Sequence, residues 1–241
     1  MFYYLISPFL NYNLILIAAA VVPAIFLMIK VYRSDRLEKE SPALLWKLVK
    51  AGVLSSLLAL VEEKVLSLIL DRFFDANTLI YNVLLYFVVV AVSEESSKYI
   101  FLKRNTWRNP EFNCSYDGVI YAVFVSLGFA IWENISYVLN FGFTTALVRA
   151  VTAIPGHACF GVFMGIFYAL AKSSENRGNR AMCGLLRKLA VIMPAILHGI
   201  YDFIASMGNQ QGTHYFLIFV AILFIVSYIL VGKASKRDRQ I

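Results

Sequence analysis

The feature that most constrains the fold is a succession of apolar stretches about twenty residues long, the length a helix needs to cross a bilayer. Apolar residues make up 60% of the 241-residue chain and charged residues 15%, against roughly 25% charged in an ordinary soluble domain. A chain of this length cannot bury so many apolar stretches in one shared core. The sequence therefore predicts an all-α, polytopic bundle of membrane helices.

Lys and Arg are concentrated in short segments between the apolar stretches. The four basic clusters lie at 30–50, 103–108, 172–188 and 233–239. The alternate connections at 1–12, 139–144 and 208–214 carry no Lys or Arg, and the one at 71–77 carries only Arg72. Loops rich in Lys and Arg stay on the cytoplasmic side of a membrane. The net charge of +7 therefore indicates orientation, and we expect no nucleic-acid partner.

Seven spans connect these segments, with the N terminus outside and the C terminus in the cytoplasm. We expect them near 12–31, 46–70, 78–102, 116–139, 145–171, 188–207 and 214–232. Glu62, Glu63 and Lys64 interrupt the second span, but without it two basic loops would fall on opposite sides of the membrane. No basic residue precedes the first apolar run, so we expect that helix to be retained. Because the connections are short, residues 1–241 are expected to form a single integral membrane domain.

Two prolines interrupt the later spans. Pro155, followed by Gly156, lies in the fifth span, and Pro194 lies in the sixth. A proline inside a helix removes a backbone hydrogen bond and bends or unwinds the helix. In a membrane such breaks are tolerated beside polar neighbours, so each proline is expected to border a polar cavity.

Several ionisable side chains fall inside the predicted spans, where each costs a few kcal/mol and normally has a function. They are Glu94, Glu95 and Lys98 in the third span, Glu133 in the fourth, Arg149 and His157 in the fifth, and His198 and Asp202 in the sixth. Counted from the nearest polar or basic boundary, Glu94, Glu133, His157, His198 and Asp202 lie about 14 to 27 Å deep at 1.5 Å per residue. Four helices are therefore expected to present polar groups to one cavity within the bilayer.

The spacing within each helix indicates which groups work together. His198 and Asp202 are four residues apart and share a face, so Asp202 could orient the imidazole or both could bind one ion or water. Glu94 and Lys98 have the same spacing. We therefore expect Lys98 to neutralise Glu94 and to leave Glu95 pointing about 100° away.

The predicted intramembrane charges do not cancel. Four carboxylates face two basic side chains, which leaves an excess of negative charge before any histidine is protonated. A divalent cation, protonated carboxyls or two imidazolium groups would each balance it. The chain has no His-Glu-x-x-His helix that would favour zinc.

Three other ionisable residues are expected to lie outside the site. Glu62 and Glu63 are expected to be interface or packing residues, and His214 a solvated one.

The order of these residues resembles the pattern of a known family. Glu94-Glu95-x-x-Lys98, Phe129-x-x-x-Glu133 and His198-x-x-x-Asp202 follow one another on successive spans, as in the PrsW family of intramembrane proteases. Asp117-Gly118, Gly128-Phe129, Glu133-Asn134, the segment 149–157 and His198-Gly199-x-Tyr201-Asp202 also look like that family. The likeness runs from about residue 93 to residue 203, and the motif-bearing core covers about 78–207.

The broader group of CAAX-processing and bacteriocin-immunity membrane proteases has the pattern Glu-Glu-x-x-x-Arg, Phe-x-x-x-His and His-x-x-x-Asn. Here Lys98 replaces the arginine and stands one position earlier, Glu133 stands for the first histidine, and Asp202 stands for the asparagine. These departures favour the PrsW family over prenyl-protein processing.

The resemblance implies an endopeptidase of the bacterial plasma membrane that cleaves a single-pass membrane protein, by site-1 cleavage of an anti-sigma factor in envelope-stress signalling. It implies a catalytic set of Glu94, Glu95, Glu133, His198 and Asp202, with the first two activating water. Lys98, Arg149 and His157 are expected to support the substrate or its oxyanion, and Arg149 could instead hold a carboxylate. The resemblance leaves two chemistries open: glutamate-based catalysis, or a divalent metal such as zinc. The candidate ligands are Glu94, Glu95, Glu133, His157, His198 and Asp202.

A different class of protein also fits the buried carboxylates. An ion- or proton-coupled transporter, or a membrane sensor without protease activity, could use them as a relay. The chain has no internal repeat of the kind from which many transporters are built. It also has no glycine-rich phosphate loop and no Gly-x-Ser-x-Gly motif, so neither nucleotide binding nor serine hydrolysis is predicted.

Overall fold

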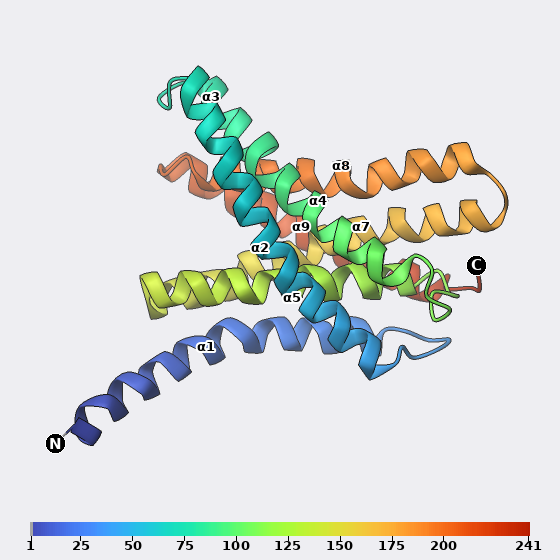
Figure 1. Cartoon of the computed structure of the whole chain (residues 1–241), viewed down its shortest axis with the longest axis horizontal. Helices are drawn as coiled ribbons and strands as arrows, with labels where there is room; N and C mark the ends of the chain where they lie inside the picture. The colour runs from blue at the N-terminus through green and yellow to red at the C-terminus, as the bar shows by residue number, and fades with distance from the viewer. Residues whose placement is uncertain (1) are drawn as a thin grey trace.

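The computed structural model describes residues 2–241, with side chains described from residue 12 onwards, and the long elements of this part are all helices (Figure 1). In chain order they are α1 (Phe2–Arg33), α2 (Pro42–Phe73), α3 (Leu79–Leu84), the π-helical segment η1 (Leu85–Val90), α4 (Ala91–Thr106), α5 (Asp117–Phe141), α6 (Phe143–Val151), α7 (Ala153–Asn176), α8 (Arg180–Ala205) and α9 (Gln210–Lys236). The segments α3, η1 and α4 form one rod, and α6 with α7 forms another. Residues 2–241 thus contain seven such helical rods, one for each of the seven predicted spans.

Six of these rods within the described residues are long and apolar enough to cross a membrane. The remaining rod, α2, has 32 residues and would reach about 48 Å, but Glu62, Glu63 and Lys64 make it more polar. The predicted all-α polytopic membrane bundle is confirmed. The complete crossing of α2 and the sidedness of the two termini stay predictions, and Met1 lies outside the described residues.

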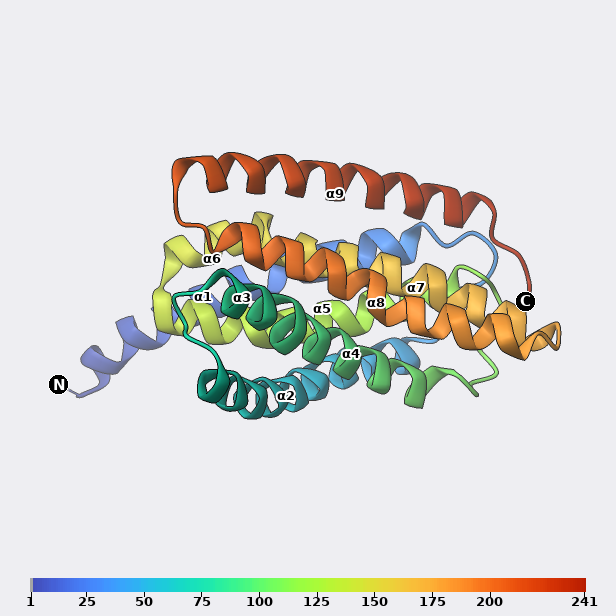
Figure 2. The ribbon, with the colours of Figure 1, turned by 90° about the horizontal axis from the view of Figure 1, so that it is seen from above.

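Helix α5 forms the centre of the bundle because glycines let its neighbours approach closely. Figure 2 shows α9 at one edge and α2 with α4 at the other, with α5, α7 and α8 between them. A Cβ atom on Gly52 of α2 would lie 2.1 Å from the Val125 carbonyl oxygen, and one on Gly128 would lie 2.3 Å from the Val49 carbonyl oxygen. Small residues permit such backbone-to-backbone packing between membrane helices. The α2–α5 crossing brings the polar part of α2 beside the motif end of α5.

The helix interruptions lie near the predicted positions, with one exception. The fifth span is divided at Thr152, between α6 and α7, and Pro155 occupies the first turn of α7. The predicted break beside Pro155 is therefore confirmed. In contrast, α8 continues through Pro194. A π-helical segment that sequence reasoning did not predict, η1, directly precedes the turn that carries Glu94. Single π-turns inside α-helices often occur at functional sites.

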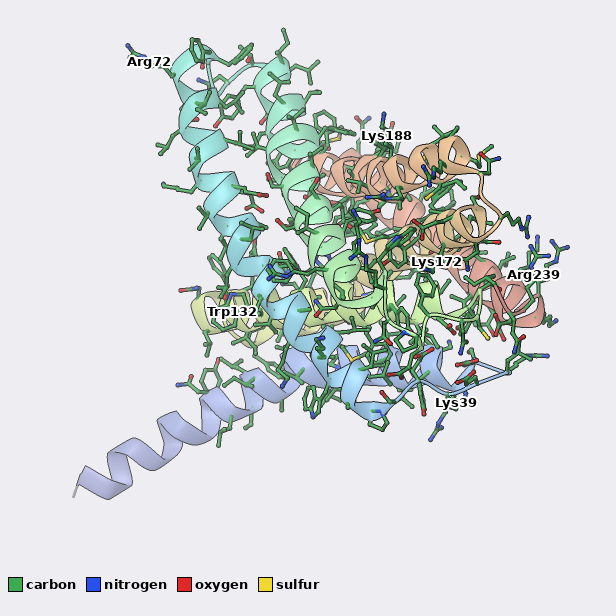
Figure 3. All side chains as sticks on the ribbon, turned by 45° about the vertical axis from the view of Figure 1, so that its right-hand side comes forward. Lys39, Arg72, Trp132, Lys172, Lys188 and Arg239 are labelled. Atoms are coloured by element: carbon green, nitrogen blue, oxygen red, sulfur yellow. The ribbon has the colours of Figure 1, made fainter. Side chains whose placement is uncertain are left out.

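The basic clusters gather at one end of the bundle. Lys39, Lys172, Lys188 and Arg239 lie toward this end, and Arg72 lies at the tip of α2 away from it (Figure 3). The C-terminal tail is fixed there, because the Ile241 amide donates to the Asn113 carbonyl at 2.8 Å. This segregation agrees with the distribution that the positive-inside rule requires of a membrane protein.

Candidate active site

The predicted ionisable residues converge in the middle of the bundle, around a cavity of about 710 Å³. Its ionisable lining comprises Glu63 of α2, Glu94 of α4, Glu133 of α5, Arg149 of α6, His157 of α7, and His198 and Asp202 of α8. Glu95 and Lys98 are fully buried and lie behind Glu94, outside the cavity lining. The expectation that several helices share one polar cavity is confirmed.

Lys98 binds both members of the carboxylate pair. Its Nζ donates to Glu95 Oε1 at 2.7 Å and to Glu94 Oε2 at 3.1 Å. The expectation that Lys98 would neutralise Glu94 and leave Glu95 free is therefore wrong. A flexible lysine side chain with three donors can reach residues three and four positions earlier on its own helix at once. Glu95 is held in place by this contact, whereas Glu94 faces the cavity.

His198 lies between three carboxylates. Its Nδ1 is 3.0 Å from Glu95 Oε1 and 3.8 Å from Glu94 Oε2, and its Nε2 is 3.3 Å from Asp202 Oδ2. The predicted shared face of His198 and Asp202 is confirmed. The ring also stacks on Phe160 of α7, with centroids 4.7 Å apart and planes 20° apart. The imidazole is thus fixed in both position and tilt.

His157 lies beside His198, with ring centroids 5.4 Å apart, and is fixed in a similar way. Lys98 Nζ lies 3.1 Å from Nδ1, and Glu133 Oε2 lies 2.7 Å from Nε2. Because an ammonium can only donate, Nδ1 accepts and Nε2–H donates to Glu133. Arg149 holds the second oxygen of Glu133 at 2.9 Å. Arg149 therefore acts on a carboxylate, which is one of the roles expected for it.

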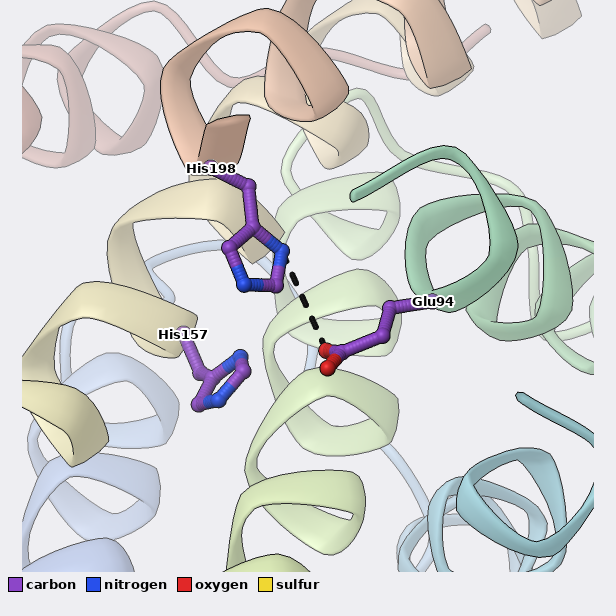
Figure 4. Close-up of side chains that lie close together, drawn as sticks. All are labelled: Glu94, His157 and His198. Carbon is purple, nitrogen blue, oxygen red and sulfur yellow. Dashed lines mark ion pairs between the residues drawn. The ribbon is translucent and has the colours of Figure 1, made fainter. Parts of the chain in front are cut away.

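Glu94, His157 and His198 form a candidate metal site (Figure 4). Each offers one ligand atom, and these atoms lie within 4.8 Å of one another. Two imidazoles and one carboxylate are a ligand set of known zinc hydrolases. In both rings Nε2 is paired with a carboxylate, Glu133 or Asp202, as the outer nitrogen of a metal-bound histidine usually is.

A positive charge, the ammonium of Lys98, already lies beside this triad. The Lys98 ammonium lies 3.1 Å from both His157 Nδ1 and Glu94 Oε2, and 4.0 Å from the centroid of the Phe129 ring. The donor set fits a divalent metal, on the condition that Lys98 yields its contact with His157 Nδ1 and Glu95 yields its contact with His198 Nδ1. The triad does not include Glu95, Glu133 or Asp202, which the resemblance also implies as candidate ligands.

Three residues of the site, Glu63, Phe129 and Phe160, are not among the site residues predicted from the sequence. Glu62 accepts a hydrogen bond from Ser97 Oγ at 3.1 Å, which agrees with the expected packing role. Glu63, the next residue, instead lines the cavity, so the same expectation is wrong for it. Phe129 and Phe160 cover Lys98 and His198 respectively. Only Phe129 had a signal in the sequence, as part of the Phe-x-x-x-Glu motif.

Comparison with known proteins identifies relatives along most of the chain. The model of the PrsW family of intramembrane metalloproteases matches residues 40–230. A protease PrsW of Oceanobacillus iheyensis is 29% identical over 221 residues, covering 92% of this chain and 96% of the relative. One of Halalkalibacterium halodurans is 30% identical over 224 residues, covering 93% and 99%. One of Bacillus subtilis is 35% identical over 131 residues, covering 54% and 58%. No solved structure matches.

Proposed function

Because the chain belongs to the PrsW family of intramembrane metalloproteases, we propose that it hydrolyses its membrane-protein substrate at the cavity lined by Glu94, His157 and His198. The family makes the chain a peptidase of the bacterial membrane. The triad is the observation that supports placing the reaction at this cavity. Its three ligand atoms come from three helices, lie within 4.8 Å of one another and belong to buried side chains.

Glu94, His157 and His198 would hold the metal that the family description implies. When bound, a divalent metal activates water as a nucleophile and polarises the substrate carbonyl. Glu133 and Asp202 keep the two imidazoles in orientation through their bonds to Nε2. Glu95 is a positioning residue, because Lys98 and His198 occupy one of its oxygens and it does not face the cavity.

Glu63 is the acceptor we assign to the proton of the attacking water, because it is a carboxyl group in the cavity lining. It lines the same cavity from α2, and among the described residues it has no ion-pair or hydrogen-bond partner. As water adds to the carbonyl carbon, its proton passes to the Glu63 carboxylate. The same proton then passes to the amide nitrogen as the carbon–nitrogen bond breaks, which regenerates the carboxylate.

The substrate we propose is a membrane-anchored anti-sigma factor, cleaved at the first site of a regulatory cascade. The support is the family assignment together with a cavity that also extends to Ser206, Gly208 and Thr213, at the junction of α8 and α9. This junction lies at the end of α8 away from the basic Arg180 end. A single-pass substrate would therefore meet the site from the side opposite the basic clusters.

Cleavage of a single-pass reporter by the purified full-length chain in liposomes tests this proposal. We expect Glu94→Gln to lower the cleavage rate by about 10²- to 10⁴-fold. Glu62→Gln is the matched control, because Glu62 is a carboxylate that bonds Ser97 outside the cavity lining. Unchanged cleavage by the Glu94 variant would remove Glu94 from the site, and loss of ion flux instead of cleavage would favour a transporter.

A further inference from the structure

A second groove lies outside the active-site cavity, between α4 and α8 at the basic end of the bundle. It has a volume of about 460 Å³ and is lined by Tyr99, Gly184, Arg187, Lys188, Val191 and Ile192. Gly184 leaves space in it, because a Cβ atom there would have no neighbour within 4 Å. The groove is therefore open to the surroundings of the bundle.

The polar part of this groove carries two basic side chains that form no direct ion pair within the described residues. Among the described residues, no carboxylate lies within salt-bridge distance of Arg187 or Lys188. Arg187 is nevertheless held in place: its Nε donates to the Tyr99 hydroxyl at 3.1 Å, and its guanidinium lies 5.4 Å from the Trp107 ring centroid. A pre-positioned guanidinium without a carboxylate partner is suited to bind phosphate oxygens.

The position of the groove along α8 matches the boundary between headgroups and acyl chains. Arg187 is seven residues from the start of α8 at Arg180, about 10 Å along the helix axis. Val191 and Ile192 follow one turn deeper, and Ile192 is 48% exposed. The groove is thus cationic at the level of the headgroups and apolar toward the middle of the bilayer.

We propose that this groove binds one anionic phospholipid, with the phosphate on Arg187 and Lys188 and an acyl chain along Val191 and Ile192. Basic pockets between membrane helices are known to bind anionic headgroups. The apolar continuation distinguishes a lipid from free phosphate, because inorganic phosphate would gain nothing from Val191 and Ile192.

The lipid would connect the two helices that supply most of the active site. Tyr99 follows Lys98 on α4, and Arg187 lies eleven residues before His198 on α8. The Glu95–His198 contact at 3.0 Å joins the same two helices. A phosphate bound by Arg187 would keep that side chain against Tyr99 and so hold α4 beside α8.

The test measures lipid retention, so it does not depend on protease activity. Full-length protein in a neutral detergent is titrated with dioleoylphosphatidylglycerol and, separately, with dioleoylphosphatidylcholine, and bound lipid is counted by native mass spectrometry. We expect preference for the anionic lipid and a roughly 30-fold weaker affinity for it in Arg187→Gln/Lys188→Gln, since each basic side chain contributes a factor of about five. Lys188→Arg keeps the charge and leaves the Arg187 guanidinium in place, so it should retain the binding.

Lys233→Gln/Lys236→Gln removes the same charge from α9 and is the matched control, expected to bind the lipid like the unmodified protein. An equal loss of lipid affinity in this control and in Arg187→Gln/Lys188→Gln would overturn the proposal, because it would indicate general attraction of the anionic lipid to the basic end of the bundle. Displacement of the lipid by millimolar inorganic phosphate would also overturn it. Elution volume and thermal midpoint verify that each variant is folded.

Discussion

At the residue scale, the site consists of side chains that face the cavity and side chains that hold them. Glu94, His157 and His198 belong to the first group, and Glu95, Glu133 and Asp202 to the second. The two groups should respond differently to substitution, since a ligand supplies the chemistry and its partner only orients it.

Asp202→Asn tests this distinction. The amide keeps the size of the side chain but weakens its bond to His198 Nε2, so we expect a 10- to 100-fold loss in metal affinity and in cleavage rate. His198→Ala should abolish both. Equal losses in the two variants, measured by metal titration and reporter cleavage, would show that Asp202 has more than an orienting role.

Glu62 and Glu63 are adjacent on α2, but their substitution should change the rate of cleavage differently. Glu63→Gln should lower the rate of the chemical step by about 10²-fold or more, because the amide cannot accept the proton of water. Glu62→Gln should leave it within about twofold, because Glu62 only accepts a bond from Ser97. Single-turnover cleavage separates this step from substrate binding. A Glu63 variant as fast as the unmodified protein would exclude it as the base.

At the scale of elements, the connection between α1 and α2 is tied to α5 by a buried carboxyl. Glu40 accepts a hydrogen bond from the Tyr121 hydroxyl at 2.6 Å, and burial raises the pKa of Glu40 to about 7. Its ordinary pKa is 4.5, so between these values the native state holds a proton that the unfolded chain releases. The corresponding stability is present at acid pH and is lost as the pH rises through about 7.

Thermal unfolding at pH 5 and pH 8 measures this effect. We expect the midpoint of the unmodified protein to fall toward pH 8, and that of Glu40→Gln to fall less, because the amide has no proton to lose. Glu38→Gln is the control, since Glu38 is an exposed acid on the same connection. An identical pH dependence in the unmodified protein and in Glu40→Gln would assign the effect to another group.

The close crossing of α2 and α5 gives a stability prediction. Gly128→Ala places a Cβ atom 2.3 Å from the Val49 carbonyl oxygen, so the helices must separate at a cost of about 1–3 kcal/mol. Gly232→Ala on α9 meets nothing within 4 Å and should be neutral or slightly stabilising. Unfolding of both variants in detergent measures the difference, and equal stability would contradict the packing argument.

The elements were more predictable from the sequence than their contacts were. Apolar runs bounded by basic clusters predict the seven rods, because length and hydrophobicity are local properties. The role of Glu63 was not predictable, since it depends on which face of α2 the Gly52–Gly128 crossing turns toward α5. The contacts of Lys98 are unpredictable for a related reason: helical spacing places its backbone but does not determine how many carboxylates its Nζ reaches.

At the scale of the whole molecule, the basic residues at one end predict the orientation. A C-terminal fusion to a fluorescent protein that matures only in the cytoplasm should fluoresce, because the positive-inside rule predicts that the end with Lys233, Lys236 and Arg239 is cytoplasmic. A fusion after Phe141, at the end of α5, should not. The reverse pattern would mean that the cavity opens to the cytoplasm and that the substrate approaches from there.

We propose that Glu94, His157 and His198 together hold one divalent metal that peptide hydrolysis requires. Cleavage of a membrane-embedded reporter tests this with purified protein that is stripped with a chelator and titrated with zinc, with metal content measured on the same samples. We expect no cleavage after stripping, full recovery at one metal per chain, and neither binding nor recovery in His157→Ala/His198→Ala. Undiminished cleavage by the stripped protein would contradict it.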